Sequence, residues 1–355
     1  MRVLVVSAPL SGHVLPLLPL ARALAEADHE ILIATAADAA TAARKQGLPV
    51  EDIAPDFDFA AIARGVALRH PWAAANKLFG TINAKLVDAV RDVTETFRPD
   101  VVVVEPLAVA GLIAAAGHGV PAVRHETNLL DGAELVQATA GPALRRLAID
   151  RLPDPAAVIQ VLPPSVVGPR PGWAMRYEPP APAPLPSWLT ETPALPRILV
   201  SRSTVAGSGN GNMMKALVAV AGSIDAEFVL VRPEPGLPPE LPDNVRTIGW
   251  VSLDAVLPTC TGIVHHGGAG TVQAALAAGV PQLVVPGPGD RRHNAELVAE
   301  IGAGISAPLK GPSAEHLQRL ITDDELRRVS VRIQDDLAIR PSPKDVAVQV
   351  ATLAS

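Results

Sequence analysis

The sequence predicts an α/β fold made of two doubly wound domains, each built on a parallel sheet. The chain has 355 residues, enough for two domains of about 150 residues each. In both halves, short β-branched runs alternate with longer alanine- and leucine-rich stretches, the pattern of parallel strands joined by helices. A proline-rich segment between Pro153 and Pro196 separates the two halves.

The first half contains four β-branched runs that predict short strands. Val101–Val104 is apolar on both faces, as a strand buried inside a parallel sheet should be. The expected strands are Val3–Val6, Ile31–Thr35, Val101–Val104 and Ala122–Arg124. The expected helices are Leu15–Ala27, Ala36–Gln46, Leu78–Phe97 and Leu107–Gly117.

The second half repeats this plan and therefore predicts a second parallel sheet. Its expected strands are Ile198–Ser201, Phe228–Val231, Gly262–His265 and Gln282–Val285. Its expected helices are Asn212–Gly222, Gly270–Ala278 and Asn294–Gly302. Ligands of this architecture bind at the carboxyl ends of the strands, so we expect the two domains to face each other across a cleft.

Proline sets the expected domain boundaries. It fixes φ and lacks an N–H donor, so the run from Pro179 to Pro186 can neither propagate a helix nor lie inside a sheet. We expect a first domain over residues 1–165, an interdomain linker over 166–196 and a second domain over 197–340. A C-terminal helix over 341–355 could pack back on the first domain.

Composition and the opening segment exclude several classes. The formal net charge of −6 argues against nucleic acid as a partner. The only cysteine, Cys260, excludes a disulfide framework and a thiolate zinc site. Ser11-Gly12-His13 interrupts the opening apolar stretch, which predicts neither a signal peptide nor stable membrane insertion. We therefore expect a cytoplasmic protein.

The most informative motif is His265-His266-Gly267-Gly268-Ala269-Gly270-Thr271, which follows an expected strand and opens an expected helix. Glycines let the backbone approach a bulky anion, and the first amides of a helix point toward it. The motif lacks the lysine of a Walker loop and the third glycine of a dinucleotide fingerprint. It predicts an anion site; the alternative is a glycine-rich turn without a special purpose.

A second polar cluster, Asp290-Arg291-Arg292-His293-Asn294, follows the next expected strand. Such side chains at the carboxyl end of a strand suit sugar hydroxyls or phosphate. The alternative is a polar loop in which Asp290 caps the next helix.

These two motifs, with Ala278-Gly279-Val280-Pro281-Gln282 and Gly302-Ala303-Gly304, resemble the donor-site signature of GT-B-fold glycosyltransferases. The resemblance is strongest to the actinobacterial enzymes that attach nucleotide-activated deoxysugars to antibiotic aglycones. It extends over nearly the whole chain and includes Ser11-Gly12-His13, which is similar to the family's first acceptor-domain turn.

The resemblance implies a GT-B fold and an inverting, metal-independent glycosyltransferase. It implies transfer of a deoxysugar from a dTDP-sugar to a hydrophobic polycyclic or macrolide aglycone of polyketide type, through oxygen or carbon. The expected partners are these two substrates alone, with no cofactor and no metal, and the expected state is a monomer or homodimer.

The resemblance also implies roles for individual residues. His13 is the candidate base, because imidazole titrates near working pH, and Glu105 or Asp131 is the candidate carboxylate that assists it. Glu105 could instead cap a helix, and Asp131 could be a turn residue before Gly132. The candidate donor-binding residues are Ser11, Arg202, Ser203, Thr204, Trp250, Val251, His266, Gly267, Gly268, Ala269, Gly270, Thr271, Asp290, Arg291 and Asn294.

Two features of the donor candidates stand apart from the motif itself. Trp250 could offer a stacking face to a nucleobase, or it could be a core tryptophan. Arg291 stands where many relatives have glutamine, so the contact to the sugar hydroxyls is expected to differ.

Two other functions fit the same motifs. A nucleotide-sugar epimerase of GT-B fold would share the diphosphate site but turn over the donor without an aglycone. A non-catalytic partner of another glycosyltransferase would bind the nucleotide sugar without turnover.

Overall fold

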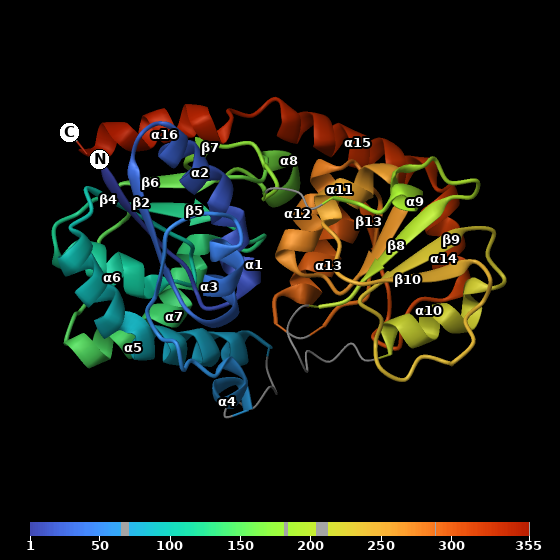
Figure 1. Cartoon of the computed structure of the whole chain (residues 1–355), viewed down its shortest axis with the longest axis horizontal. Coiled ribbons are helices and arrows are strands. Elements are labelled where there is room, and N and C mark those ends of the chain that lie inside the picture. The colour runs from blue at the N-terminus through green and yellow to red at the C-terminus, as the bar shows by residue number, and fades with distance from the viewer. Residues whose placement is uncertain (65–70, 181–183, 204–211, 288, 355) are drawn as a thin grey trace. The chain divides into compact units, whose positions relative to one another are not determined.

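The computed structural model describes residues 1–64, 71–180, 184–203, 212–287 and 289–354. The chain forms two compact units, of which the first comprises Met1–Pro180 with Ile339–Ser355 and the second comprises Ala181–Ala338. Each unit contains a parallel sheet covered by helices (Figure 1). The predicted fold class of two parallel α/β domains is confirmed.

The first unit is built on a seven-stranded sheet with the order β3-β2-β1-β4-β5-β6-β7. Strand β1 lies between β2 and β4, so that Val3 is aligned with both Ile31 and Val101. The strands are β1 (Arg2–Val6), β2 (Glu30–Thr35), β3 (Val50–Asp52), β4 (Val101–Val104), β5 (Ala122–Glu126), β6 (Ala157–Gln160) and β7 (Trp173–Ala174).

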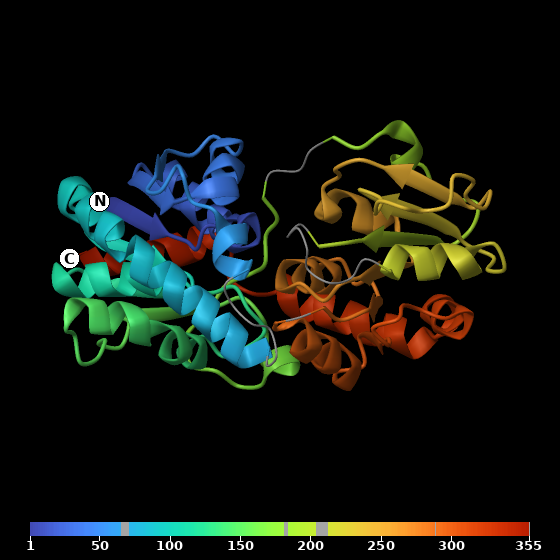
Figure 2. The same cartoon turned by 90° about the horizontal axis from the view of Figure 1, so that it is seen from below.

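Strand alternation directs apolar side chains to both faces of this sheet. Val3 and Val5 pack in a core with residues of α2 and α16, whereas Leu4 and Val6 pack in a core with residues of α5, α6 and α7. The long helix α5 lies beside α6 and α7 (Figure 2). The helices are α1 (Ser11–Val14), α2 (Leu18–Glu26), α3 (Ala37–Arg44), α4 (Phe59–Arg64), α5 (Pro71–Phe97), α6 (Val109–Gly117), α7 (Gly132–Leu147), α8 (Pro164–Val167) and α16 (Pro343–Ala351).

The second unit is built on a six-stranded sheet with the order β10-β9-β8-β11-β12-β13. Phe228, Val264 and Leu283 pack against α10 and α14 on one face of the sheet. The strands are β8 (Arg197–Ser201), β9 (Glu227–Val231), β10 (Val245–Ile248), β11 (Gly262–His265), β12 (Gln282–Val284) and β13 (Gly304–Ser306). The helices are α9 (Ser187–Thr190), α10 (Met213–Ala221), α11 (Leu253–Val256), α12 (Ala269–Ala277), α13 (Arg291–Glu300), α14 (Ala314–Thr322) and α15 (Asp324–Ala338).

The first expected helix, over 15–27, differs from the structure. The chain is already helical at Ser11, passes through a short 3-10 turn at Leu15–Leu17 and resumes as α2. Pro16 lies in that turn and Pro19 in the first turn of α2. Proline lacks an N–H and is tolerated only where a helix begins, so the segment divides into two helices.

The proline-rich segment, expected as a linker over 166–196, is instead packed at both ends. Val166 and Met175 are buried in the first unit, where β7 pairs with β6. Leu189 is buried in the second unit, and its carbonyl accepts a hydrogen bond from Arg197 Nη1 at 3.0 Å. Prolines restrict the backbone of this segment, but they do not prevent the apolar side chains between them from packing into the cores of the two units. The first unit therefore extends to Pro180 rather than to residue 165.

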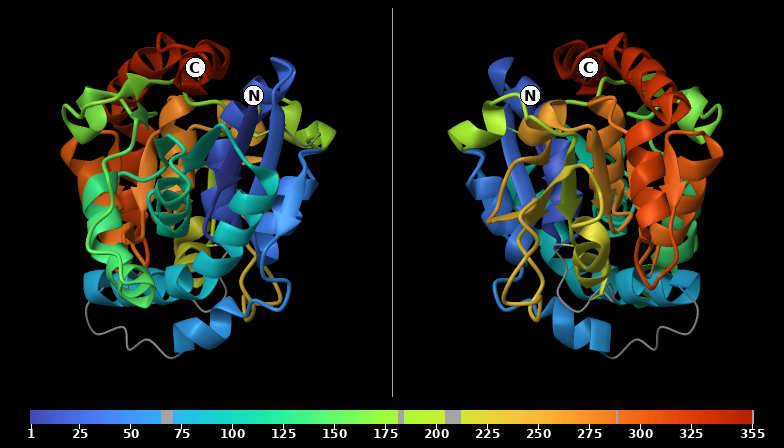
Figure 3. Two further views of the ribbon diagram at one scale, coloured as in Figure 1. Left: turned by 90° about the vertical axis from the view of Figure 1, so that its left-hand side faces the viewer. Right: turned by 90° about the vertical axis from the view of Figure 1, so that its right-hand side faces the viewer.

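The last helix, α16, belongs to the first unit although the whole second unit precedes it in the chain. Val346, Ala347 and Val350 are buried in the same core as Leu20 and Leu24 of α2. Both termini therefore lie on the first unit (Figure 3). Across the residues described, no helix is both long and apolar enough to cross a membrane.

The burial of α16 predicts that its apolar face stabilises the first unit. Val346→Ala removes two methyl groups from a fully buried side chain and should lower the free energy of unfolding by about 2 kcal/mol, measured by urea denaturation. The matched control is Val348→Ala on the same helix, where the side chain is 68% exposed and little change is expected. Equal losses in both variants would contradict this packing.

Candidate active site

His13 lies on α1, the short helix that follows the loop after β1. The backbone N–H of His13 donates to Leu10 O at 2.9 Å. The amide of Ser11, the first residue of α1, donates to Asp38 Oδ2 at 3.2 Å. A carboxylate from α3 thus takes the place of an N-cap residue, because Leu10 offers no capping side chain.

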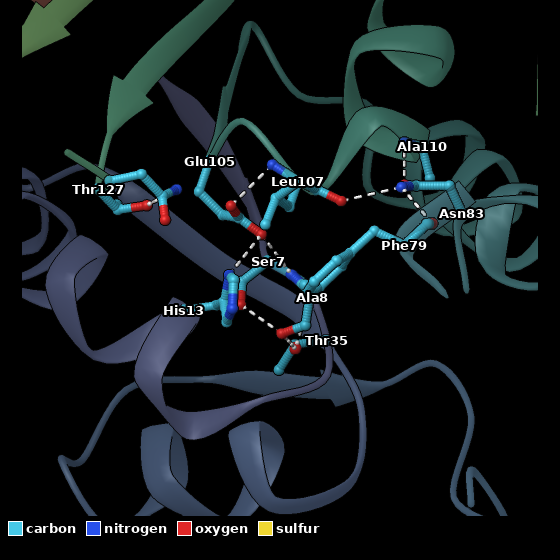
Figure 4. Close-up of polar contacts among 11 residues, drawn as sticks. Ser7, Ala8, His13, Thr35, Phe79, Asn83, Glu105, Leu107, Ala110 and Thr127 are labelled. Carbon is cyan, nitrogen blue, oxygen red and sulfur yellow. Dashed lines mark hydrogen bonds and ion pairs between the residues drawn. The ribbon is translucent and has the colours of Figure 1, made fainter. Parts of the chain in front are cut away.

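Glu105 immediately follows β4, and its side chain is fully buried. Its Oε1 accepts a hydrogen bond from the amide of Ala8 at 3.1 Å, and its Oε2 accepts one from the amide of Leu107 at 2.8 Å. The same Oε1 lies 3.3 Å from His13 Nδ1 (Figure 4). Two backbone donors therefore fix the carboxylate beside the imidazole, an arrangement that orients a histidine and stabilises its protonated form.

Helix α5 supplies two further residues of this site that the sequence analysis missed. The Phe79 ring lies 5.3 Å from the His13 ring between centroids. Asn83 is buried and donates from Nδ2 to Leu107 O at 2.9 Å, while its Oδ1 accepts from the amide of Ala110 at 2.9 Å (Figure 4). Asn83 thereby fixes the loop that carries Glu105. A polar residue on the buried stripe of a helix was the available signal.

Asp131, the other candidate carboxylate, has a different position. It is the N-cap of α7, and its Oδ1 accepts from the amide of Ala133 at 2.7 Å. Arg170 Nε lies 4.0 Å from its other oxygen. The described contacts thus pair Glu105 with His13 and give Asp131 a capping role.

In the second unit, the glycine-rich motif connects β11 to α12 as predicted. His265 is fully buried; its Nδ1 accepts from the amide of Gly267 at 3.1 Å, and its Nε2 lies 2.9 Å from Gln282 Oε1. Burial lowers the pKa of His265 to about 4. The pKa of His266 is well below its usual value, first because of burial and then because of the charge of Arg291. Both rings are therefore neutral near pH 7.

Glycine is required at the two positions after this histidine pair. Gly267 has φ +85°, and a Cβ there would lie 2.8 Å from Arg291 O. A Cβ on Gly268 would lie 2.5 Å from His266 Nε2. The turn therefore packs directly against the first residue of α13 and the His266 ring, and the first amides of α12 follow it.

Residues of the polar cluster at 290–294 form hydrogen bonds with this turn and with the end of β8. Asn294 Nδ2 donates to Gly267 O at 2.8 Å and to Asp290 Oδ2 at 3.0 Å. Arg291 Nη2 donates to Ser203 Oγ at 2.9 Å, which connects α13 to the end of β8. The expected polar cluster and the glycine motif thus form one hydrogen-bonded group.

Two of the remaining donor candidates, Arg202 and Trp250, contact Arg232, which directly follows β9. Arg202 Nε donates to Arg232 O at 2.6 Å, and the Arg232 guanidinium lies 5.4 Å from the centre of the Trp250 ring. Trp250 is 64% exposed, which excludes the core alternative, whereas Val251 is buried. Ser11 lies in the first unit, and Thr204 falls outside the described residues.

Among the residues described, no group of three or more His, Cys, Asp or Glu could hold a metal ion.

Comparison with solved structures identifies the class as GT-B glycosyltransferases. The glycosyltransferase SnogD from Streptomyces nogalater aligns with a TM-score of 0.82 and 32% identity, covering 99% of each chain. SsfS6 from Streptomyces sp. SF2575, solved in complex with thymidine diphosphate, aligns with a TM-score of 0.86 and 28% identity, again covering 99% of each chain.

Sequence comparison identifies the family within that class. Residues 70–203 match the N-terminal domain, and residues 215–353 the C-terminal domain, of the Erythromycin biosynthesis protein CIII-like family. The Elloramycin glycosyltransferase ElmGT of Streptomyces olivaceus is 34% identical over 99% of this chain and 97% of its own length. The chain belongs to this family of antibiotic-biosynthesis glycosyltransferases, as the sequence motifs predicted.

The close packing of Gly267 predicts a stability difference within the motif. Gly267→Ala places a Cβ at a left-handed φ and against the Arg291 backbone, and should cost about 2 kcal/mol or more in the free energy of unfolding. Gly270→Ala is the control, since beyond its chain neighbours and the backbone of its own helix nothing lies within 4 Å of its Cβ position, and alanine favours a helix. Similar unfolding curves for the two variants would contradict the packing.

Buried neutral histidines predict a loss of stability in acid. His125 is fully buried, and burial lowers its pKa from 6.5 to about 4. Between those pH values the unfolded state binds a proton that the folded state does not, so the free energy of unfolding falls as pH falls from 7 to 4, by up to about 3 kcal/mol for this residue. His125→Leu should reduce the slope measured by urea denaturation at several pH values. Exposed His293→Gln is the control; an unchanged slope in His125→Leu would refute the assignment.

Proposed function

We propose that this protein transfers a deoxysugar from a dTDP-sugar to a hydrophobic, polyketide-type aglycone with inversion and without a metal. The observation that carries the proposal is the contact between His13 and the buried Glu105 in a member of this glycosyltransferase family. Relatives support the donor class: one solved relative is complexed with thymidine diphosphate, and one similar sequence is named a TDP-daunosamine transferase. The acceptor class is supported by another solved relative, the spinosyn rhamnosyltransferase SpnG, which is complexed with spinosyn aglycone.

In the proposed reaction, His13 acts as the general base. Its imidazole removes the proton from the acceptor hydroxyl, and the acceptor attacks the anomeric carbon of the sugar from the side opposite the diphosphate. The bond between the anomeric carbon and the diphosphate oxygen breaks, and dTDP leaves with the electron pair. Glu105 stabilises the imidazolium that forms and holds the ring in place.

The second unit would bind the leaving group. The first amides of α12 would donate hydrogen bonds to the diphosphate, and Arg291 would add a positive charge beside them. A bound metal is not needed in this proposal, because these donors stabilise the diphosphate as its charge increases.

The test uses the purified protein with a panel of dTDP-deoxysugars and polyketide aglycones, with product mass and anomeric configuration as readouts. His13→Ala should lower kcat by about 10²- to 10⁴-fold. Glu105→Gln should also lower kcat and change its pH profile, because the neutral amide cannot stabilise the His13 imidazolium as the carboxylate does. In addition, the amide NH2 would face the backbone N–H of Ala8 or of Leu107. Asp131→Asn keeps the acceptor oxygen of the α7 cap and should have a much smaller effect.

Three outcomes would contradict the proposal. Turnover of the donor without an aglycone would indicate an epimerase. Binding of dTDP without any turnover would indicate a non-catalytic partner. A kcat of His13→Ala equal to that of the unmodified protein would exclude His13 as the base.

A further inference from the structure

Gln282 and His265 form a fully buried polar pair beneath the glycine-rich turn. Gln282 is the first residue of β12, and His265 is the last residue of the neighbouring strand β11. Both have 0% exposure, and Gln282 Oε1 lies 2.9 Å from His265 Nε2. In the strand register, Gln282 is opposite Ile263, two residues before His265 on the same face of the sheet.

The contacts of His265 determine its protonation state. Its Nδ1 accepts a hydrogen bond from the backbone N–H of Gly267, so Nδ1 carries a lone pair and no proton. A neutral imidazole then carries its proton on Nε2 and donates it to Gln282. This also fixes the orientation of the Gln282 amide, since only its oxygen can accept that proton. Protonation of Nδ1 would set two donors against each other.

Two of the hydrogen bonds described in this region hold the backbone of Gly267. Its amide N–H is held by His265, and its carbonyl accepts from Asn294 Nδ2 at 2.8 Å. With both groups held, Gly267 keeps φ +85° and Gly268 takes the extended conformation that starts α12. The direction of the first amides of α12 therefore depends on which nitrogen of His265 carries the proton.

We propose that Gln282 is a positioning residue of the donor site. It holds His265 in the Nε2-protonated form, so that Nδ1 can fix Gly267 and orient the amides that bind the diphosphate of the donor. The last step rests on the proposed function; the coupling between Gln282, His265 and Gly267 does not.

A role in packing alone does not account for the glutamine. Its Nε2 is buried without a hydrogen-bond partner among the described residues, and leaving such a donor unpaired destabilises the fold. Methionine or leucine would fill a similar volume without that penalty. The glutamine provides what they lack, an oxygen that accepts the His265 proton.

The first experiment tests the coupling without any ligand. In the ¹⁵N spectrum of the His265 ring, the unmodified full-length protein should show one tautomer, with the proton on Nε2. In Gln282→Met, the spectrum should change to a mixture of tautomers. Leu283→Ala is the control, since its side chain lies in the core on the other face of β12 and its loss should leave the ring spectrum unchanged.

The second experiment measures the affinity for dTDP by calorimetry in a double-mutant cycle. Gln282→Met should weaken binding about tenfold. His265→Asn provides a side-chain oxygen that can accept the Gly267 N–H directly, so adding Gln282→Met to this variant should produce little further loss. Leu283→Ala should reduce stability but retain most of the affinity.

The outcomes separate this inference from the proposed function. An unchanged His265 spectrum in Gln282→Met, or an equal loss of affinity with and without His265→Asn, would overturn the positioning role. If the unmodified protein fails to bind dTDP while the spectrum responds as expected, the proposed donor is wrong and the coupling between Gln282 and His265 stands. In that case the diphosphate step of this inference is overturned.

Discussion

Backbone N–H groups just beyond the carboxyl ends of the central strands require hydrogen-bond acceptors. The structure of both units near these strand ends depends on which buried side chain accepts from them. In the first unit, Glu105 accepts from the amides that follow β1 and β4. In the second unit, His265 accepts from the amide of Gly267 after β11. Each acceptor is buried and sits at a strand end, where it fixes the loop and a second polar side chain, His13 or Gln282. An unpaired amide in these places would cost about 1–3 kcal/mol.

The two acceptors lie at the same end of corresponding strands in the two sheets, Glu105 just after β4 and His265 at the last residue of β11. Strands β1 and β4 are adjacent although β2 and β3 lie between them in the chain, and β8 and β11 are adjacent in the same way. At such a switch point, consecutive loops diverge to opposite sides and leave strand ends accessible to side chains. His13 and Glu105 follow β1 and β4, whereas Ser203 and the glycine motif follow β8 and β11. The repeated strand order thus places polar groups at the same end of corresponding strands. In the first unit these groups are a histidine and a carboxylate, and in the second they are a hydroxyl and the amides of a glycine-rich turn.

Sequence patterns predicted the features that are determined by residues close together in the chain. Strand ends and the glycine motif are local, so the positions of His13, Glu105 and the donor turn could be inferred. The choice between Glu105 and Asp131 could not, because it depends on how the loops after β4 and β5 fold. Asn83 was missed, and Gln282 was noted only as the end of a motif, for a similar reason. The loop residues that Asn83 binds lie 24 and 27 residues away, and His265 lies 17 residues from Gln282, so the chain order does not reveal these pairs. The proline-rich segment was assigned as a linker because proline predicts backbone conformation but not the burial of the side chains beside it.

The return of α16 to the first unit affects how the chain folds during synthesis. The second unit is inserted within the first, so all of its residues leave the ribosome before Val346 and Val350 can complete the core beside α2. Until then, the apolar surface that faces α16 is exposed while the second unit is already able to fold. The first unit therefore begins earlier and finishes later, and its final packing step joins the two ends of the polypeptide.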